Sequence, residues 1–291
     1  MKKIKKIAVL TSGGDAPGMN AAIRSVVRTC AYYRIDCIGV FRGYQGLIEG
    51  DFVPMSARSV SSIINKGGTM LKSARSNEFR TEAGRKKAYD NLIAAEIDGL
   101  ILIGGDGSFT GGLIFNKEYN FPLIGIPGTI DNDIFGTDYT IGYDTALNTV
   151  VEVIDKIRDT ASSHNRLFFV EVMGRDAGFI ALNAGIGAGA EEILIPEENL
   201  GLERLLDSLK RSKRAGKSSS IVVIAEGDKL GKNVFELRDY VEEHLPEYDV
   251  RVSVLGHMQR GGAPSCFDRV LASRLGVKAV ELLLDGHSNL M

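Results

Sequence analysis

Short apolar runs recur along the chain, and polar residues do not alternate within them. Strands that are apolar on both faces are typical of a parallel sheet that helices cover on both sides. We expect strands at residues 7–10, 37–41, 100–103, 123–126, 167–172, 193–195, 221–225 and 250–255. The intervening segments have helical periodicity and predict helices at 19–33, 85–96, 146–161, 203–214, 234–243 and 267–284. Alternating strands and helices indicate a mostly parallel, doubly wound α/β fold.

The length of the chain, 291 residues, favours two domains over one. No linker-like or low-complexity segment marks a boundary between them. We therefore expect discontinuous domains, with the chain crossing back to the first domain near Leu255.

Composition excludes several classes of partner and compartment. The net charge of -2 provides no overall attraction to nucleic acid or to an acidic membrane. The cysteines, Cys30, Cys37 and Cys266, are odd in number and lack the tight spacing of a disulfide framework or a zinc site. The lysines and apolar residues of MKKIKKIAVL resemble a signal peptide, but the apolar run has only the length of a strand. No segment approaches the roughly 20 apolar residues of a membrane span, so we expect a soluble cytoplasmic protein.

Glycine-bearing polar turns directly follow four of the expected strands, at 13–14, 104–107, 127–128 and Gly174. Ligands of open α/β sheets bind outside the carboxyl ends of the strands. A single glycine turn is better explained by the needs of a tight turn than by a site. Four such turns, each with Asp, Arg or Thr beside the glycine, favour one composite site.

The first turn, residues 11–18 with the sequence TSGGDAPG, is suited to phosphate. Backbone without side chains lets amide N–H groups approach the anion, and the following helix adds its positive end. The segment is no Walker A loop, because no Gly-Lys-Ser/Thr follows it.

The second turn is GGDGS at 104–108. Asp106 could hold Mg²⁺ on a polyphosphate, while Gly107 and Ser108 present N–H groups to phosphate oxygens. Similar turns occur in kinases that act on small molecules, lipids or NAD, so the motif indicates an ATP kinase better than it names a substrate. The alternative is that Asp106 only caps the next helix.

The third turn, PGTIDND at 127–133, places Asp131 and Asp133 two residues apart. In an extended segment their side chains share a face, so that one can meet a hydroxyl and the other the metal region. Phosphoryl transfer needs a carboxylate that orients and deprotonates the attacking hydroxyl.

Basic residues accompany these turns. Arginine binds phosphate through two parallel hydrogen bonds, and any one arginine is more often on the surface than in a site. Their shared placement near strand ends favours a site for Arg75, Arg166, Arg175 and Arg260. His257, in the same segment as Arg260, is equally compatible with a packed core histidine.

Seven collinear motifs together resemble the bacterial ATP-dependent 6-phosphofructokinases: GGDAPGMNAAIR, KSAR, GGDGS, PGTIDND, SSHNR, VMGR and LGHMQRGG. The resemblance covers essentially the whole chain. It implies two Rossmann-like three-layer α/β/α domains with the active site in the cleft between them, and a homotetramer in which sites are shared between subunits. It also implies an ATP-binding domain formed by 1–141 plus 259–291, and a fructose 6-phosphate-binding domain at 142–258.

The resemblance implies a glycolytic kinase that uses MgATP to phosphorylate the 1-hydroxyl of fructose 6-phosphate, with Asp131 as base. Thr129, Asp133, Arg75 and Arg175 would complete the catalytic set, and Asp106 would bind Mg²⁺. The implied ATP contacts are Gly14, Tyr44, Arg75, Ser76, Asp106, Gly107, Ser108 and Gly111. The implied fructose 6-phosphate contacts are Thr129, Asp131, Met173, Gly174, Arg175, Glu226, His257 and Arg260, with Arg166 and Arg251 reaching the 6-phosphate from the neighbouring subunit.

Two glycines favour ATP as the phosphoryl donor. Pyrophosphate-dependent relatives carry Asp where Gly107 stands and Lys where Gly128 stands, and an acid at position 107 would repel the α-phosphate of ATP. A pyrophosphate-dependent phosphofructokinase is the first alternative. Another GGDG-type kinase is a second, and a non-catalytic sugar-phosphate sensor is a third. The presence of both Asp106 and Asp131 argues against the sensor.

The chain departs from the family at the effector site and at its end. Residues that match the site for ADP or phosphoenolpyruvate are Arg24, Arg28, Arg158, Glu191 and Lys217. Ala57 and Ala215 stand where the family has an arginine and a lysine, so we expect weaker or altered allosteric control. The chain also ends at Met291, before the final strand and helix of such enzymes, which indicates a truncation or a short variant.

Overall fold

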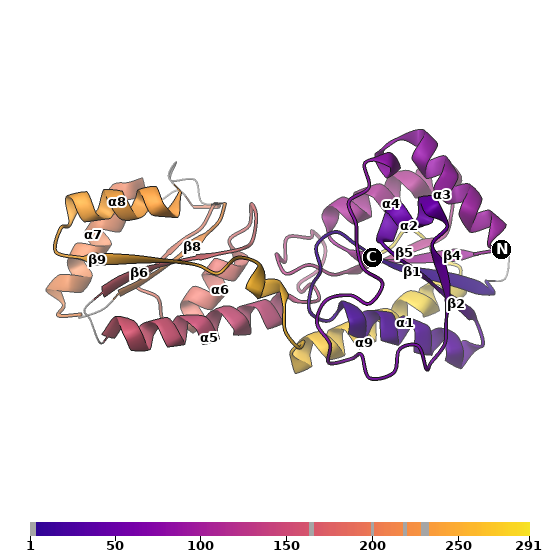
Figure 1. The fold of residues 1–291 in the computed structure, drawn as a ribbon, viewed down its shortest axis with the longest axis horizontal. Coiled ribbons are helices and arrows are strands. Elements are labelled where there is room, and N and C mark those ends of the chain that lie inside the picture. Colours follow the sequence, from indigo (N-terminus) through magenta and orange to yellow (C-terminus); the bar gives the residue numbers. More distant parts are fainter. Residues whose placement is uncertain (1–3, 163–165, 199–200, 218–219, 228–232) are drawn as a thin grey trace. The chain divides into compact units, whose positions relative to one another are not determined.

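The computed structural model describes residues 4–162, 166–198, 201–217, 220–227 and 233–291 (Figure 1). The chain forms two compact units. The first unit comprises Met1–Thr129, Ile134–Asp144 and Arg260–Met291, and the second comprises Ile130–Asp133 and Thr145–Gln259. The sequence placed the boundaries after residues 141 and 258. It did not anticipate that the four residues 130–133 would belong to the second unit.

The sheet of the first unit has five strands in the order β3-β2-β1-β4-β5. Their bounds are β1 Lys6–Ser12, β2 Asp36–Val40, β3 Phe52–Met55, β4 Gly99–Gly104 and β5 Leu123–Pro127. All neighbours pair in parallel except β2 and β3, which are antiparallel.

Helices cover both faces of this sheet (Figure 1). One face carries α1 (Met19–Tyr33) and α9 (Cys266–Leu284), and the other carries α2 (Gly43–Glu49), α3 (Glu82–Ala94) and α4 (Asp106–Tyr119). Leu10 and Leu102 point into the cluster that also contains Leu47, Leu92 and Phe115 of the second group of helices. Every residue of β4 is buried, which explains why its sequence is apolar without alternation.

The second unit repeats this architecture with four parallel strands in the order β7-β8-β6-β9. The strands are β6 Arg166–Val172, β7 Glu192–Leu194, β8 Ser220–Ala225 and β9 Asp249–Val254. One face carries α5 (Tyr143–Ser162) and α6 (Phe179–Gly187), and the other carries α7 (Gly201–Arg214) and α8 (Val234–His244) (Figure 1). Within the described part of the chain, no helix has the length and hydropathy needed to cross a bilayer.

The α/β fold with mostly parallel sheets is confirmed, but four elements were missed. The strand β3 is a short antiparallel edge strand, and its Pro54 hid it, because proline is tolerated only at sheet edges. The helices α2, α4 and α6 were absent from the expected helix ranges, although a helix was expected to follow the turn at Asp106. Each contains two or more glycines, which weaken the helical signal of a sequence.

Close packing of α1 against α9 fixes one face of the first unit. Ser25 Oγ donates a hydrogen bond of 2.6 Å to the carbonyl of Ser273. A Cβ atom at Gly276 would lie 2.6 Å from Ser25 Cβ and 3.1 Å from the carbonyl oxygen of Ala22. The approach of the two helices therefore depends on the missing side chain at Gly276.

We predict that Gly276→Ala destabilises the protein by about 1–3 kcal/mol, because the new methyl group forces α1 and α9 apart. At an unconstrained helix position the same change would instead stabilise by about 1 kcal/mol. Urea denaturation followed by circular dichroism measures the difference. Lys278→Ala, on the exposed side of α9, is the control and should change stability little. A stabilised Gly276→Ala would contradict the packing described.

Candidate active site

The turns that follow β1, β4 and β5 lie at one edge of the first sheet. Ser12 pairs with Gly104, and Gly104 pairs with Pro127, so the three strands end in register. A hydrogen bond of 2.9 Å from Ser108 Oγ to Ser12 Oγ ties the first turn to the start of α4. The prediction that these glycine turns converge is therefore confirmed for the first unit.

The first turn leaves its backbone accessible. Gly13 has φ of 87° and Gly18, directly before α1, has φ of 110°, and both values favour glycine. Gly14 faces the guanidinium of Arg260, whose Nη1 donates a hydrogen bond of 3.3 Å to the carbonyl of Asp15. The structure thus brings Arg260 beside the predicted phosphate turn.

Asp106 and Gly107 are the first two residues of α4, and both are exposed. The residue that caps the helix is Gly105, which provides no side-chain hydrogen bond, so the capping explanation for Asp106 is wrong. The free N–H groups of a first helical turn carry partial positive charge and attract anions. A Cβ atom at Gly107 would meet nothing within 4 Å, so packing does not explain the glycine.

The buried side chain of Tyr44 packs against the first turns of α4. Its hydroxyl donates a hydrogen bond of 2.5 Å to the carbonyl of Ser108, and its ring stacks on Phe79 with centroids 3.9 Å apart. A Cβ atom at Gly111 would lie 3.3 Å from the Tyr44 ring. Burial raises the pKa of the Tyr44 phenol well above its usual value. Tyr44 therefore orients the start of α4 chiefly as a neutral hydrogen-bond donor.

Arg75 and Ser76 lie in the segment before η1 (Glu78–Arg80). Ser76 Oγ donates a hydrogen bond of 2.8 Å to Gln45 Oε1 and is thereby held in place. Arg75 is exposed and has no ion pair among the residues that the structure describes. Its charge is available to an anion.

The predicted base, Asp131, is completely buried. Its Oδ2 lies 3.3 Å from Nε of Arg175, which belongs to the same unit. The segment is bent and Asn132 has φ of 53°, so the expectation of an extended segment is wrong. As a result Asp131 is buried while Asp133 is exposed. Thr129 is also buried, and its carbonyl accepts a hydrogen bond of 2.6 Å from Thr140.

The carboxyl end of β6 collects several predicted sugar-phosphate contacts. The N–H of Arg175 donates a hydrogen bond of 2.9 Å to Glu226 Oε1, and the N–H of Met173 donates one of 3.2 Å to Gln259 Oε1. Gly174 between them has φ of 143°. His257 is exposed on η2 (Gly256–Arg260), so it is not a packed core histidine.

Two neighbours of this turn were not assigned a role from the sequence. Gln259 is fully buried and also donates a hydrogen bond of 3.0 Å to the carbonyl of Gly256. A Cβ atom at Gly227 would lie 2.0 Å from the carbonyl oxygen of Arg175, so only glycine fits there. Gln259 lies inside a motif that was recognised, whereas Gly227 follows β8 without any distinguishing signal.

Arg166 and Arg251 lie at the other end of the same sheet. Arg166 is the first residue of β6 and pairs in register with Asp249 of β9. Both arginines contact Asp249, with Arg166 Nε 2.9 Å from Oδ2 and Arg251 Nη2 2.9 Å from Oδ1. The six steps of β6 separate Arg166 from Val172 by about 20 Å. The neighbouring motif residues Ser163, His164 and Asn165 lie outside the described residues.

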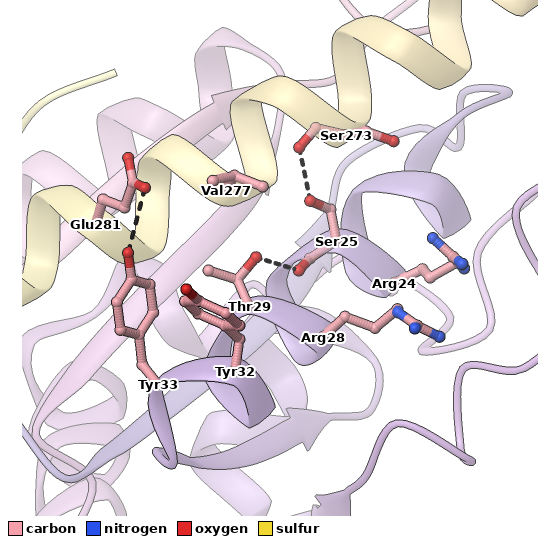
Figure 2. A pocket seen from close by; sticks show the side chains of 9 residues that line it. All are labelled: Arg24, Ser25, Arg28, Thr29, Tyr32, Tyr33, Ser273, Val277 and Glu281. Carbon is pink, nitrogen blue, oxygen red and sulfur yellow. Dashed lines mark hydrogen bonds between the residues drawn. The ribbon is translucent and has the colours of Figure 1, made fainter.

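The residues that match an effector site fall into two groups. In the second unit, Glu191 lies 3.2 Å from Lys217 Nζ and 3.9 Å from Arg158 Nη1. In the first unit, Arg24 and Arg28 line a pocket of about 380 Å³ between α1 and α9. Figure 2 shows the guanidinium groups of Arg24 and Arg28 directed to the same side. Tyr33, near the end of α1, also lines the pocket, and its hydroxyl donates a hydrogen bond of 3.4 Å to Glu281 Oε1 of α9.

Comparison with known proteins identifies the class. The phosphofructokinase family model matches residues 6–283. ATP-dependent 6-phosphofructokinase 1 of Thermus thermophilus is 56% identical over 288 residues, which are 99% of this chain and 89% of the relative. ATP-dependent 6-phosphofructokinase 2 of Bacteroides thetaiotaomicron is 53% identical over 291 residues, which are 100% of this chain and 89% of the relative. The chain belongs to the phosphofructokinase family.

Solved structures agree with this assignment. The phosphofructokinase of Saccharomyces cerevisiae has a TM-score of 0.91 at 41% identity, over 97% of this chain and 42% of that one. A pyrophosphate-dependent phosphofructokinase from Marinobacter aquaeolei has a TM-score of 0.86 over 98% of this chain and 77% of that one. Its identity of 23% supports likeness of fold only.

We predict that Tyr44 does not ionise in the folded protein between pH 8 and pH 11, where an exposed tyrosine with a pKa of about 10 does. Burial disfavours the phenolate, so the raised pKa of Tyr44 moves its titration to higher pH. Spectrophotometric titration at 295 nm should give the same absorbance change for Tyr44→Phe as for the unmodified protein. A smaller change in Tyr44→Phe would show that Tyr44 titrates normally.

Proposed function

We propose that this chain is an ATP-dependent 6-phosphofructokinase of glycolysis. It transfers the γ-phosphoryl group of ATP to the 1-hydroxyl of fructose 6-phosphate and releases fructose 1,6-bisphosphate and ADP. Relatives with this activity in their names match at 53% and 56% identity over nearly the whole chain. The structural observation that supports it best is the buried carboxylate of Asp131 beside the guanidinium of Arg175.

The edge of the first sheet is suited to the nucleotide. Backbone N–H groups of the turn at Gly14 and of Gly107 in the first turn of α4 would bind phosphate oxygens. The N–H of Ser108, which the sequence also assigned to phosphate, donates instead to the carbonyl of Gly105 over 3.0 Å. Tyr44, Gly111, Arg75 and Ser76 would complete the ATP contacts. Gly107, the second residue of α4, is exposed and has no packing role, so the close approach of a ligand would account for the glycine.

Asp106 fits Mg²⁺ that arrives with the nucleotide. Magnesium in kinases is usually held by one or two carboxylates together with substrate phosphates. Among the described residues no group of three potential ligands forms a self-sufficient metal site, whereas Asp106 presents an exposed carboxylate at the positive end of α4. When bound, Mg²⁺ would neutralise phosphate charge.

Asp131 would act as the general base. It accepts the proton of the 1-hydroxyl as that oxygen bonds to the γ-phosphorus and the bond from phosphorus to the ADP oxygen breaks. Arg175, 3.3 Å from Asp131, and Arg75 supply positive charge for the transferring phosphoryl group. Thr129 and Asp133 flank the base in the chain and would help to position the hydroxyl.

Fructose 6-phosphate would bind at the carboxyl end of β6. Met173, Gly174, Arg175, Glu226, His257 and Arg260 provide its contacts in one copy of the chain. Arg166 and Arg251 would bind the 6-phosphate of a neighbouring copy, because Arg166 lies about 20 Å along β6 from Val172 and Arg251 pairs with Phe168, four residues before Val172. This sharing suits the homotetramer that the family resemblance implies, and a dianion would compete with Asp249 for both arginines.

Regulation and location complete the proposal. ADP or phosphoenolpyruvate would act at Arg24, Arg28, Arg158, Glu191 and Lys217, with weaker control where Ala57 and Ala215 replace basic residues. The cytoplasm is the proposed location, since Cys30, Cys37 and Cys266 are free thiols that suit a reducing compartment.

We predict that Asp131→Ser lowers kcat by about 10²–10⁴-fold, because it removes the base. The KM for fructose 6-phosphate should change much less, since the base acts mainly in the transition state. A coupled assay of fructose 1,6-bisphosphate formation measures both constants. Asp138→Asn, an exposed acid seven residues further on, is the matched control and should retain activity. If the unmodified protein showed no turnover in this assay, the chain would be a non-catalytic binding protein and the proposed function would be wrong.

We predict that Gly107→Asp raises the KM for ATP by at least tenfold, because the new carboxylate repels the α-phosphate. Gly107→Ala adds a methyl group without charge and should have a smaller effect. The space beside Gly107 is open, so neither variant should lower the melting temperature appreciably. Equal losses in both variants would show that bulk, rather than charge, selects the donor.

A further inference from the structure

Lys72 holds a backbone conformation that is unfavourable for lysine. Its φ is 58°, in the left-handed region that residues other than glycine seldom adopt. The N–H of Lys72 donates a hydrogen bond of 3.1 Å to the carbonyl of Thr69, and the N–H of Arg42 donates one of 2.8 Å to the carbonyl of Leu71, so the backbone is held on both sides. Residues in such a conformation are enriched at binding and catalytic sites. A glycine would adopt this φ without strain, which indicates that the side chain of Lys72 has a role of its own.

The contacts of the Lys72 backbone lead to the turn after β1 that is suited to phosphate. Thr11 Oγ1 donates a hydrogen bond of 2.9 Å to the carbonyl of Lys72 and lies 2.8 Å from Thr69 Oγ1. One residue further on, Ser73 Oγ donates a hydrogen bond of 2.8 Å to the carbonyl of Gly13. Thr11 and Gly13 both belong to the turn TSGGDAPG. Lys72 is therefore fixed beside the turn where phosphate is expected to bind.

The ammonium group of Lys72 is not neutralised by an acidic side chain. Lys72 is exposed, and its side chain forms no ion pair or hydrogen bond within the residues that the structure describes. Packing in the core therefore does not account for the residue. Arg75, three positions further along the same segment, is also exposed and lacks an ion pair within those residues. Two uncompensated positive charges on one segment suit an anion with several negative charges.

We propose that Lys72 is a further residue of the donor site and supplies positive charge to the phosphates of the nucleotide. The ammonium group of lysine is a compact charge on a flexible stem, so it can bind a phosphate without the fixed geometry that arginine requires. Most of the proposed sugar-phosphate contacts belong to the second unit, whereas Lys72 and the turn at Gly13 belong to the first. The inference rests on the proposed function in one respect, namely that the anion bound at this turn is a nucleotide phosphate.

The first test is Lys72→Met, which removes the charge and keeps an unbranched side chain. We expect the KM for ATP to rise about tenfold, as for the loss of one charged hydrogen bond, while the KM for fructose 6-phosphate stays nearly constant. Lys72→Arg keeps the charge and should recover most of the affinity. Lys117→Met, an exposed lysine in the last turn of α4, is the matched control and should leave both constants unchanged. An unchanged KM for ATP in Lys72→Met, or a rise confined to fructose 6-phosphate, would overturn the proposal.

A second variant, Lys72→Gly, separates the charge from the backbone conformation, because glycine adopts φ of 58° freely. It should raise the KM for ATP as much as Lys72→Met does. Unequal effects of the two variants would show that the backbone, rather than the charge, is responsible and would refute the proposal. Since salt screens exposed charges, the KM for ATP of the unmodified protein should also rise more steeply with added KCl than that of either variant.

Equilibrium binding distinguishes this inference from the proposed function. Isothermal titration calorimetry with Mg²⁺ and AMP-PNP, a non-hydrolysable analogue of ATP, requires no turnover. Weaker binding by Lys72→Met in a chain without phosphofructokinase activity would support the role of Lys72 and refute only the function. Equal binding by Lys72→Met and by the unmodified protein, in an active enzyme, would refute the role of Lys72 alone. No binding by the unmodified protein would overturn both.

Discussion

The parallel pairing of β1, β4 and β5 is the constraint on which the proposed nucleotide site of the first unit depends. Because these strands end in register, the turns after Ser12, Gly104 and Pro127 must meet at one edge of the sheet. The buried apolar residues of the strands fix that register, since a slip would disturb the packing on both faces. The buried strand β4 therefore fixes the position of the exposed first turn of α4, which follows it directly through Gly105.

A buried charge dominates the candidate site of the second unit. Burial of a carboxylate is costly unless a partner compensates it, and Asp131 has the guanidinium of Arg175 within 3.3 Å. Arg175 itself adopts φ of 53°, which is unfavourable for arginine, and its N–H is held by Glu226. Strained backbone of this kind is concentrated at functional sites. The chain thus accepts both an electrostatic and a conformational cost at the position where the proposed chemistry needs a carboxylate and a cation together.

Sequence reasoning was most successful where packing alone decides the outcome. The apolar runs predicted the parallel strands, and the glycine turns after β1, β4 and β5 were correctly expected to meet at one edge of the sheet. The edge strand β3 and the glycine-containing helix α2 were not predicted, because proline and glycine weaken the hydrophobic periodicity from which strands and helices are predicted. The bend at Asn132, and the pairing of Arg166 with Asp249 on a neighbouring strand, depend on tertiary contacts between distant segments. No local sequence pattern encodes such contacts. The motif resemblance therefore singled out Arg166 but did not predict its contact with Asp249.

The central claim is that the chain phosphorylates fructose 6-phosphate with ATP as donor. Its most direct test is formation of fructose 1,6-bisphosphate by the purified protein with fructose 6-phosphate and Mg²⁺, measured in parallel with ATP and with pyrophosphate. The account predicts turnover with ATP and none with pyrophosphate. Turnover with pyrophosphate would contradict the interpretation of Gly107 and Gly128, and no turnover with either donor would contradict the proposed function itself.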